Sequence, residues 1–407
     1  MSKHIKKFET EQAFAQWRQS EDCELPQLSW CVTEDTIKSE AAPHDYSQDY
    51  FTIVSTSDNN VIGWKASNAS VAKTISVSTD DGQTWIDKTS TSGGTTLATL
   101  NTGDKLLIKG SNTAYGASSS NYKYFTSTGQ FNVEGNIMSM IYGDNFSGQT
   151  VLSQPYTLKY LFYNAKVVDA SNLVLPATTL ENYCYQSMFR DCTSLTTAPA
   201  ILPADALITY CYTLMFAGCT SLTTAPALPA TTLANNCYLS MFNGCTSLTT
   251  APTLPATKLA DGCYYNMFKG CTSLTTAPTL PATTVYNCYN NMFSDCTSLT
   301  TAPALPATTL ADCCYQEMFR GCTGLTTAPE LPATKLEAYC YCQMFDGCTN
   351  LNYIKCLATS GLNTTSATTN WVANVAASGT FVKDLSMSGW TIGVDGIPNG
   401  WTVQDAS

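Results

Sequence analysis

The stretch CYTLMFAGCTSLTTAPALPAT, residues 211–231, decides the architecture, because the chain repeats it with small changes along close to half its length. The pair Cys-Tyr that opens each copy begins at seven positions, namely Cys184, Cys211, Cys237, Cys263, Cys288, Cys314 and Cys340. Successive copies therefore follow one another every 25 to 27 residues. A period in this range is typical of proteins in which short units stack on one another.

Each copy contains a pattern that predicts a short helix followed by a strand. Tyr212, Met215, Phe216 and Cys219 lie at i, i+3, i+4 and i+7, the spacing that gathers side chains on one helix face. Gly218 is placed to end that helix in a left-handed conformation. The threonine-rich stretch that follows predicts one strand, and Ala-Pro-x-Leu-Pro predicts a turn.

One such unit cannot bury its apolar face alone, so neighbouring copies are expected to stack. Two positions keep the same phase in every copy and predict an inner ladder of buried side chains. The cysteines of this ladder are Cys192, Cys219, Cys245, Cys271, Cys296, Cys322 and Cys348, and the leucines are Leu195, Leu222, Leu248, Leu274, Leu299, Leu325 and Leu351. Free cysteine is commonly buried as a small hydrophobic side chain, so we interpret these thiols as structural. Oxidation of stacked thiols after release from a cell remains an open alternative.

This repeat resembles the BspA-like leucine-rich repeats of surface and phage-associated proteins from gut Bacteroidales. The residues that carry the resemblance are the aromatic-rich segment, the Cys-x-x-Leu step and the Leu-Pro turn. The resemblance implies a leucine-rich-repeat α/β solenoid of about seven units over residues 151–357. It also implies adhesion as a common role, without fixing one reaction.

Residues 46–150 have a different pattern, with alternating apolar and polar residues between turns rich in Gly, Asn and Asp. This pattern predicts a β-sandwich-like domain. Ser78-Thr-Asp-Asp-Gly-Gln-Thr-Trp85 fits the Asp-box hairpin turn, which is structural even in sialidases. Trp64, Tyr115, Tyr122 and Tyr124 are expected mostly in the core, with sugar stacking as the alternative.

The two ends complete a multi-domain α+β organisation. Residues 1–45 predict an N-terminal docking segment made of a helix and a strand, and residues 358–407 predict a C-terminal cap over the last repeat. The opening residues and the stretch 131–146 also resemble the leading parts of proteins from Bacteroidales phages. That resemblance implies docking onto other virion proteins through the N-terminal part.

Composition narrows the function classes. The chain has 407 residues, a formal net charge of −11 and two histidines, and it has no apolar run long enough to span a bilayer. We therefore expect no nucleic-acid partner, because phosphate binding needs a basic face. We also expect no membrane insertion, no metal site, no cofactor and no catalytic residues, since the common catalytic and metal-ligand constellations are missing.

Residues that differ between the copies are the candidates for a binding face, because amide and tyrosine side chains suit glycans or protein loops. These candidates are Asn182, Gln186, Asn236, Tyr265, Asn266, Asn290, Asn291 and Gln316. A merely solvated face is an equal alternative.

The leading hypothesis is a non-enzymatic phage virion protein, a capsid decoration or a tail fibre. It would assemble in the host cytoplasm as a homo-oligomer and contact a host surface glycan or protein. A bacterial cell-surface adhesin of the same repeat family is one alternative. A carbohydrate-active enzyme using a carboxylate pair is the other.

Overall fold

The computed structural model describes residues 44–68, 72–118 and 120–406. The chain divides into two units, Met1–Asp45 and Tyr46–Ser407. The docking helix and strand expected in the first unit lie outside the described residues.

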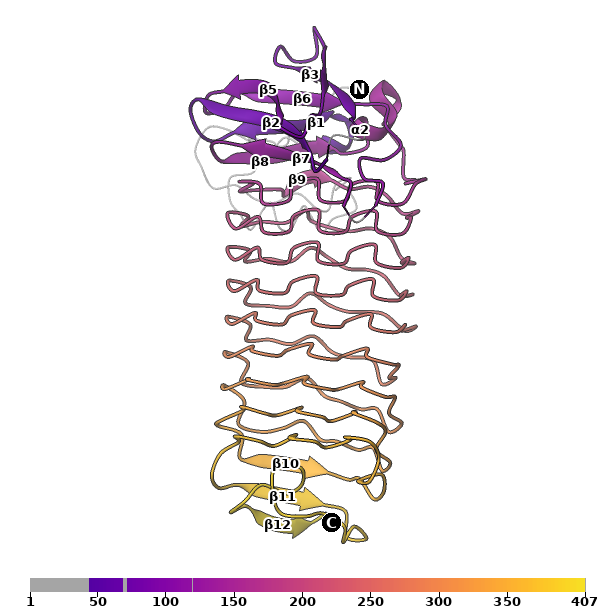
Figure 1. Cartoon of the computed structure of the whole chain (residues 1–407), viewed down its shortest axis with the longest axis vertical. Helices are drawn as coiled ribbons and strands as arrows, with labels where there is room; N and C mark the ends of the chain where they lie inside the picture. The colour runs from indigo at the N-terminus through magenta and orange to yellow at the C-terminus, as the bar shows by residue number, and fades with distance from the viewer. Residues whose placement is uncertain (1–43, 69–71, 119, 407) are drawn as a thin grey trace, which may run out of the picture. The chain divides into compact units, whose positions relative to one another are not determined.

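Two groups of mostly antiparallel strands form the beginning of the second unit (Figure 1). The larger sheet has the order β4-β3-β6-β1-β8-β9, in which the last strand is β9 (Asn172–Val174), and the smaller one has the order β5-β2-β7. The first eight strands are β1 (Phe51–Ser55), β2 (Asn60–Ala66), β3 (Thr74–Ser78), β4 (Ile86–Thr89), β5 (Thr95–Leu100), β6 (Lys105–Lys109), β7 (Lys123–Ser127) and β8 (Phe131–Asn136).

The two sheets share one apolar core because alternate side chains of their strands point inward. Phe51 of β1 and Trp64 of β2 both contact Phe125 of β7, with ring centroids 5.7 and 4.7 Å apart. Trp64 and Tyr115 are fully buried, as expected for core aromatics, whereas Tyr122 and Tyr124 remain partly exposed. The two sheets therefore face each other across one core.

The Asp-box sequence makes the turn between β3 and β4. The Asp80 carboxylate accepts hydrogen bonds from the Ser78 hydroxyl at 2.6 Å and from the Thr84 amide at 2.9 Å. These bonds lower the pKa of Asp80 to about 2. Trp85 then packs against the Tyr50 ring, with centroids 5.0 Å apart. Asp80 therefore has a structural role in this turn.

The β-domain continues into the repeats without a break in the core. β9 (Asn172–Val174) pairs in parallel with β8, and one cluster of buried side chains extends from Phe51 to Trp401. The short helices of this part are η1 (Tyr46–Gln48), α2 (Ser139–Tyr142) and η2 (Gly143–Asn145). The boundary expected near residue 150 therefore falls within continuous packing.

The helix predicted in each repeat is wrong. The described residues after η2 contain no helix, and the segment from Tyr210 to Gly218 is a row of turns. Tyr210, Leu214 and Gly218 have φ values of 59°, 56° and 76°, so every fourth residue is left-handed. A left-handed residue interrupts a right-handed helix, because it redirects the backbone N–H groups. The left-handed conformation expected at Gly218 is nevertheless present.

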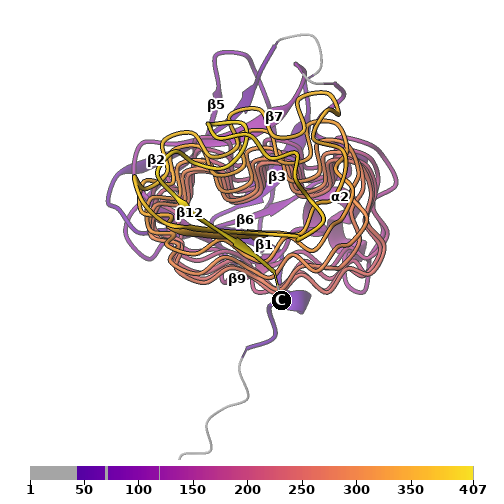
Figure 2. The same cartoon turned by 90° about the horizontal axis from the view of Figure 1, so that it is seen from below.

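The hydrogen bonds explain why this alternating backbone is stable. The Tyr212 and Phe216 amides donate to the carbonyls of Cys237 and Met241 in the next coil, at 3.0 and 2.9 Å. The Met215 amide instead donates within its own coil, to the Tyr212 carbonyl at 3.2 Å. Amides that join neighbouring coils thus alternate with amides that bond within their own coil, so both sets find partners without a helix. We call residues 151–357 the repeat stack, and Figure 2 shows its coils superimposed in end view.

The strand predicted in each repeat is shorter than expected. Thr197 bridges Asp169 on one side and Thr224 on the other, and Thr250 bridges Thr276, all as isolated parallel bridges. The repeats therefore resemble a ladder of single contacts more than a continuous sheet. The secondary structure of the described chain is mostly strand and turn with few helical residues, so the expected mixture of helix and strand is partly wrong.

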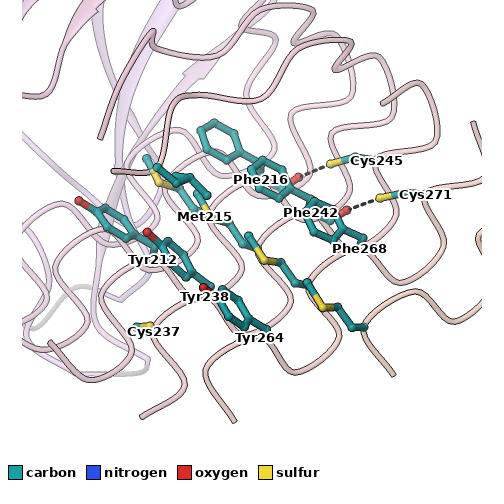
Figure 3. Close-up of a cluster of buried hydrophobic side chains, with 14 of the residues drawn as sticks. Tyr212, Met215, Phe216, Cys237, Tyr238, Phe242, Cys245, Tyr264, Phe268 and Cys271 are labelled. Carbon is teal, nitrogen blue, oxygen red and sulfur yellow. Dashed lines mark hydrogen bonds between the residues drawn. The ribbon is translucent and has the colours of Figure 1, made fainter. Parts of the chain in front are cut away.

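The inner side chains form columns that run from coil to coil (Figure 3). Phe216, Phe242 and Phe268 are nearly parallel, with ring centroids 5.7 and 5.6 Å apart. A second column contains the tyrosine that follows the first cysteine of each copy, from Tyr185 to Tyr341. All fourteen cysteines and leucines of the expected ladder are fully buried.

Residues 358–407, expected as a C-terminal cap, continue the stack beyond the last repeat. β10 (Tyr353–Cys356), β11 (Thr380–Lys383) and β12 (Thr402–Asp405) pair in parallel order. Trp371 is fully buried and stacks on Tyr341 at 6.1 Å and on Trp390 at 5.4 Å. A tryptophan thus takes the place of the repeated aromatic residues where the copies end.

Candidate binding cleft and the surface of the repeats

The predicted binding-face residues lie on the row of turns, but they do not share one environment. Asn182 is exposed, and Gln186, Asn236, Tyr265, Asn266 and Gln316 are partly exposed. Asn290 and Asn291 are each only 5 % exposed. The six residues other than Asn290 and Asn291 are therefore the accessible members of the set.

The two buried asparagines bond to each other and to their neighbours. The Asn291 amide donates to the Asn290 carbonyl oxygen at 2.6 Å, and the Asn290 amide donates to Asn287 at 2.9 Å. Asn290 also lies 3.3 Å from the Gln316 carbonyl oxygen of the next coil. Their hydrogen-bonding capacity is used inside the stack, which leaves little of it for a ligand.

The ladder thiols are held as hydrogen-bond donors. The Cys245 and Cys271 thiols donate to the Phe216 and Phe242 carbonyls of the preceding coil, at 3.2 and 3.1 Å (Figure 3). Burial raises the pKa of Cys263, in the other thiol column, to about 12. A nucleophilic cysteine needs the opposite shift, because the thiolate is the reactive form. These thiols are therefore poor nucleophiles, and their role is structural.

The described residues form neither a metal site nor a membrane span. Across the described ranges, no three His, Cys, Asp or Glu side chains come together as a metal would need. The helices of the described chain are also too short to cross a bilayer.

A cleft of about 750 Å³ lies where the β-domain meets the first coils of the repeat stack. Lys65 of β2 and Tyr124 of β7 are direct partners across these strands, so both side chains project from the same face. The opposite wall comes from two coils, through Tyr163, Lys166 and the segment that begins at Asp191. Residues far apart in sequence thus form one concave surface.

The cleft is polar and carries an excess of positive charge. Lys65 and Lys166 form no ion pair with any described residue. Lys166 donates instead to the Thr128 carbonyl at 2.7 Å. The one lining carboxylate, Asp191, lies 3.4 Å from the Arg190 guanidinium outside the cleft. The Ser127 hydroxyl is buried in the lining and has no hydrogen-bond partner among the residues that the structure describes.

Tyrosines connect this cleft with the side of the repeat stack. Tyr124 contacts Tyr163 edge to face at 6.4 Å, Tyr163 contacts Tyr160 at 5.3 Å, and Tyr160 packs on Tyr122 at 4.2 Å. These four residues are all partly exposed. They form a band of aromatic surface that the sequence does not reveal, because its members come from the β-domain and from the first coil.

Nearby, Lys159 is enclosed by tyrosine rings. Its ammonium lies 5.1 Å from the Tyr156 ring centroid and 5.3 Å from that of Tyr160. Burial lowers the pKa of Lys159 to about 8. The rings favour the charged form while burial disfavours it.

The comparisons with known proteins agree with the repeat pattern. Residues 215–352 match the family described as "BspA type Leucine rich repeat region", in six copies. The repeats within residues 215–352 therefore match the BspA-type leucine-rich repeats. The copy that begins at Cys184 precedes the matched region.

One crystal structure of a leucine-rich repeat protein, from Bacteroides ovatus, is similar with a TM-score of 0.32 and 14 % sequence identity. The similarity covers 67 % of this chain and 75 % of that chain. No curated protein matches the sequence.

Proposed function

We propose that the chain is a non-catalytic attachment protein that presents its repeat stack, as a solenoid, to a partner surface. The observation that carries the proposal is the contrast between uniform core columns and a variable outer column. Phe, Met and Tyr recur in every copy of the repeat, whereas the position after Cys-Tyr changes from Gln186 to Leu239, Tyr265 and Gln316, which are all partly exposed. A stack of this kind keeps one backbone while its outward side chains vary, which suits recognition.

The chemistry of the described titratable groups supports binding over catalysis. Thiols with raised pKa values are poor nucleophiles, and Asp80 is engaged in its turn. The surface offers groups suited to binding, namely amide side chains, tyrosine rings and an open cleft of about 750 Å³.

We further propose that the attachment protein is carried on a phage particle as a capsid decoration or a tail fibre. The support for this is the resemblance of the opening residues and of stretch 131–146 to phage proteins. In this proposal residues 1–45 dock onto other virion proteins, and the protein assembles as a homo-oligomer in the host cytoplasm. A cell-surface adhesin with the same repeats shares the attachment role but not the location.

The attachment role can be tested with fluorescently labelled full chain added to Bacteroidales cells. We expect saturable binding that unlabelled chain competes away and that a heat-unfolded sample lacks. Binding that is absent, or that does not saturate, would contradict an attachment role.

A further inference from the structure

We propose that the cleft between the β-domain and the first coils binds a carboxylated oligosaccharide. The inference rests on the proposed attachment function, because it names the ligand class of a site on the same protein. It is carried by four features of the cleft: its volume, its tyrosine rings, its ammonium groups without an acidic partner and its exposed polar side chains.

The volume and shape fit a small flexible ligand. A cleft of about 750 Å³ lies within the range of about 300–1,000 Å³ that is usual for ligand sites. Its walls come from β2, β7 and two successive coils, so a ligand there would contact both the β-domain and the repeat stack. The lining contains only one aliphatic side chain, that of Ala165, so it does not suit an apolar ligand.

The combination of tyrosine and polar groups favours a sugar. A pyranose ring presents C–H groups on its face and hydroxyls around its edge. An aromatic ring packs on the C–H face, and amides and hydroxyls form hydrogen bonds with the sugar hydroxyls. Tyr124 and Tyr163 lie at the lining with partly exposed rings. The Asn164 and Thr193 side chains are exposed at the lining and can bond the sugar hydroxyls.

The charge of the cleft favours a carboxylate on that sugar. Lys65 and Lys166 bring two positive charges, and the only lining acid, Asp191, is already next to Arg190. This local excess lies in a chain whose formal net charge is −11. An ammonium without an acidic partner gains a charge-assisted hydrogen bond when a carboxylate arrives. The overall negative charge opposes a densely charged polyanion such as nucleic acid, so a sparsely charged saccharide is the better fit.

Calorimetric titration of the full chain tests the proposal directly. The probes are tetragalacturonate, a hyaluronan tetrasaccharide and sialyllactose, each compared with its carboxyl methyl ester. We expect at least one acid to bind about tenfold more tightly than its ester, and we expect added salt to reduce the difference. Absence of binding by all three acids, or equal affinity for acid and ester, would overturn the proposal.

Substitutions locate the binding at this cleft. We expect Lys65→Gln to weaken binding of the acid about tenfold while leaving the ester unaffected. Tyr124→Leu should weaken both forms, and Tyr124→Phe should restore most of the affinity because it keeps the ring. Lys88→Gln, on β4 and outside the lining, removes the same charge from the same domain and serves as the matched control. Equal affinities of the Lys65 and Lys88 variants would contradict the proposed site.

The same variants separate this inference from the attachment function. If labelled Lys65→Gln protein binds cells as well as the Lys88→Gln protein does, the cleft is not the attachment site and the attachment function stands. If the unaltered chain binds no cells at all, the attachment function itself fails. Thermal unfolding of each variant shows whether it has folded.

Discussion

The thiol of Cys245 donates a hydrogen bond to the backbone carbonyl of Phe216, at 3.2 Å, in the coil that precedes it. The same relationship joins Cys271 to Phe242 and Cys348 to Phe319, at 3.1 and 3.0 Å. Each ladder cysteine thus fills space in the core and connects two coils through its S–H group. This explains why a cysteine-rich chain can use its thiols in the reduced form.

Replacing one of these thiols should therefore cost both packing and a hydrogen bond. We expect Cys245→Ala to lower the free energy of unfolding by about 1–2 kcal/mol. The Phe216 carbonyl keeps a second donor, the Cys219 amide, so the loss stays moderate. Urea denaturation measures the change. Cys313→Ala is the control, because Cys313 is only partly buried and should cost less.

Stability should fall as the pH rises above about 9. Burial raises the pKa of Cys263 and Cys348 to about 12, whereas an unfolded thiol titrates near 9. The unfolded chain then loses protons that the folded chain keeps, so unfolding becomes more favourable with increasing pH. Lys123 and Lys159 act in the opposite direction, since burial lowers their pKa to about 8, but the buried thiols outnumber them.

Urea denaturation in the presence of a reductant, from pH 7 to pH 10.5, checks this dependence. A midpoint that stays constant or rises through this range would contradict the buried, protonated thiol columns. Cys263→Ala should make the decrease above pH 9 shallower than it is in the unaltered chain.

The left-handed residues of the turns can be distinguished from helix residues by substitution. Asn266 has a φ of 55°, so a β-branched side chain there is strained, and we expect Asn266→Val to cost about 1–2 kcal/mol. Asn266→Gly should cost much less. Asn243→Val, two residues after Met241 on the same kind of turn, lies outside the left-handed set and provides the control. Equal losses at Asn266 and Asn243, measured by urea denaturation, would contradict the alternating backbone.

Trp371 should hold the last coils onto the repeat stack. Its ring nitrogen donates to the Gly396 carbonyl at 2.8 Å, and its ring is fully buried between Tyr341 and Trp390. We expect Trp371→Ala to cost about 3–5 kcal/mol and to increase amide exchange mainly in β11 and β12. Exchange that increases evenly from β1 to β12 would instead show that the coils do not unfold locally at this end. Trp390→Ala is the milder control, because Trp390 is partly exposed.

The repeat period, the buried Cys and Leu positions and the left-handed residue at Gly218 could all be predicted from the sequence, because each depends on a residue type that recurs in phase. The helix could not be excluded in that way. Tyr212, Met215, Phe216 and Cys219 have helical spacing, yet the same spacing places side chains inward when every fourth residue is left-handed. Leu214 and Ser240 are left-handed although neither residue type favours that conformation. The neighbouring coil therefore sets the backbone conformation there, and the residue type does not reveal it.

The cleft was also beyond prediction from the sequence. Lys65 and Tyr124 are brought together by strand register, and Tyr163 and Asp191 are added by the stacking of coils. Comparison of the repeats in the sequence does not connect these four residues. Asn290 and Asn291 were predicted at the surface because these positions vary between copies. The structure buries both residues, so variation alone did not identify exposed side chains.

Immunogold electron microscopy with an antibody against residues 171–357 tests the central claim most directly. Purified phage particles and uninfected host cells are labelled in parallel, with antibody preadsorbed on the purified chain as the control. We predict gold on capsids or tails and none on uninfected cells, with its position distinguishing decoration from fibre. Gold on uninfected cells and none on particles would contradict the virion assignment and identify a bacterial adhesin instead.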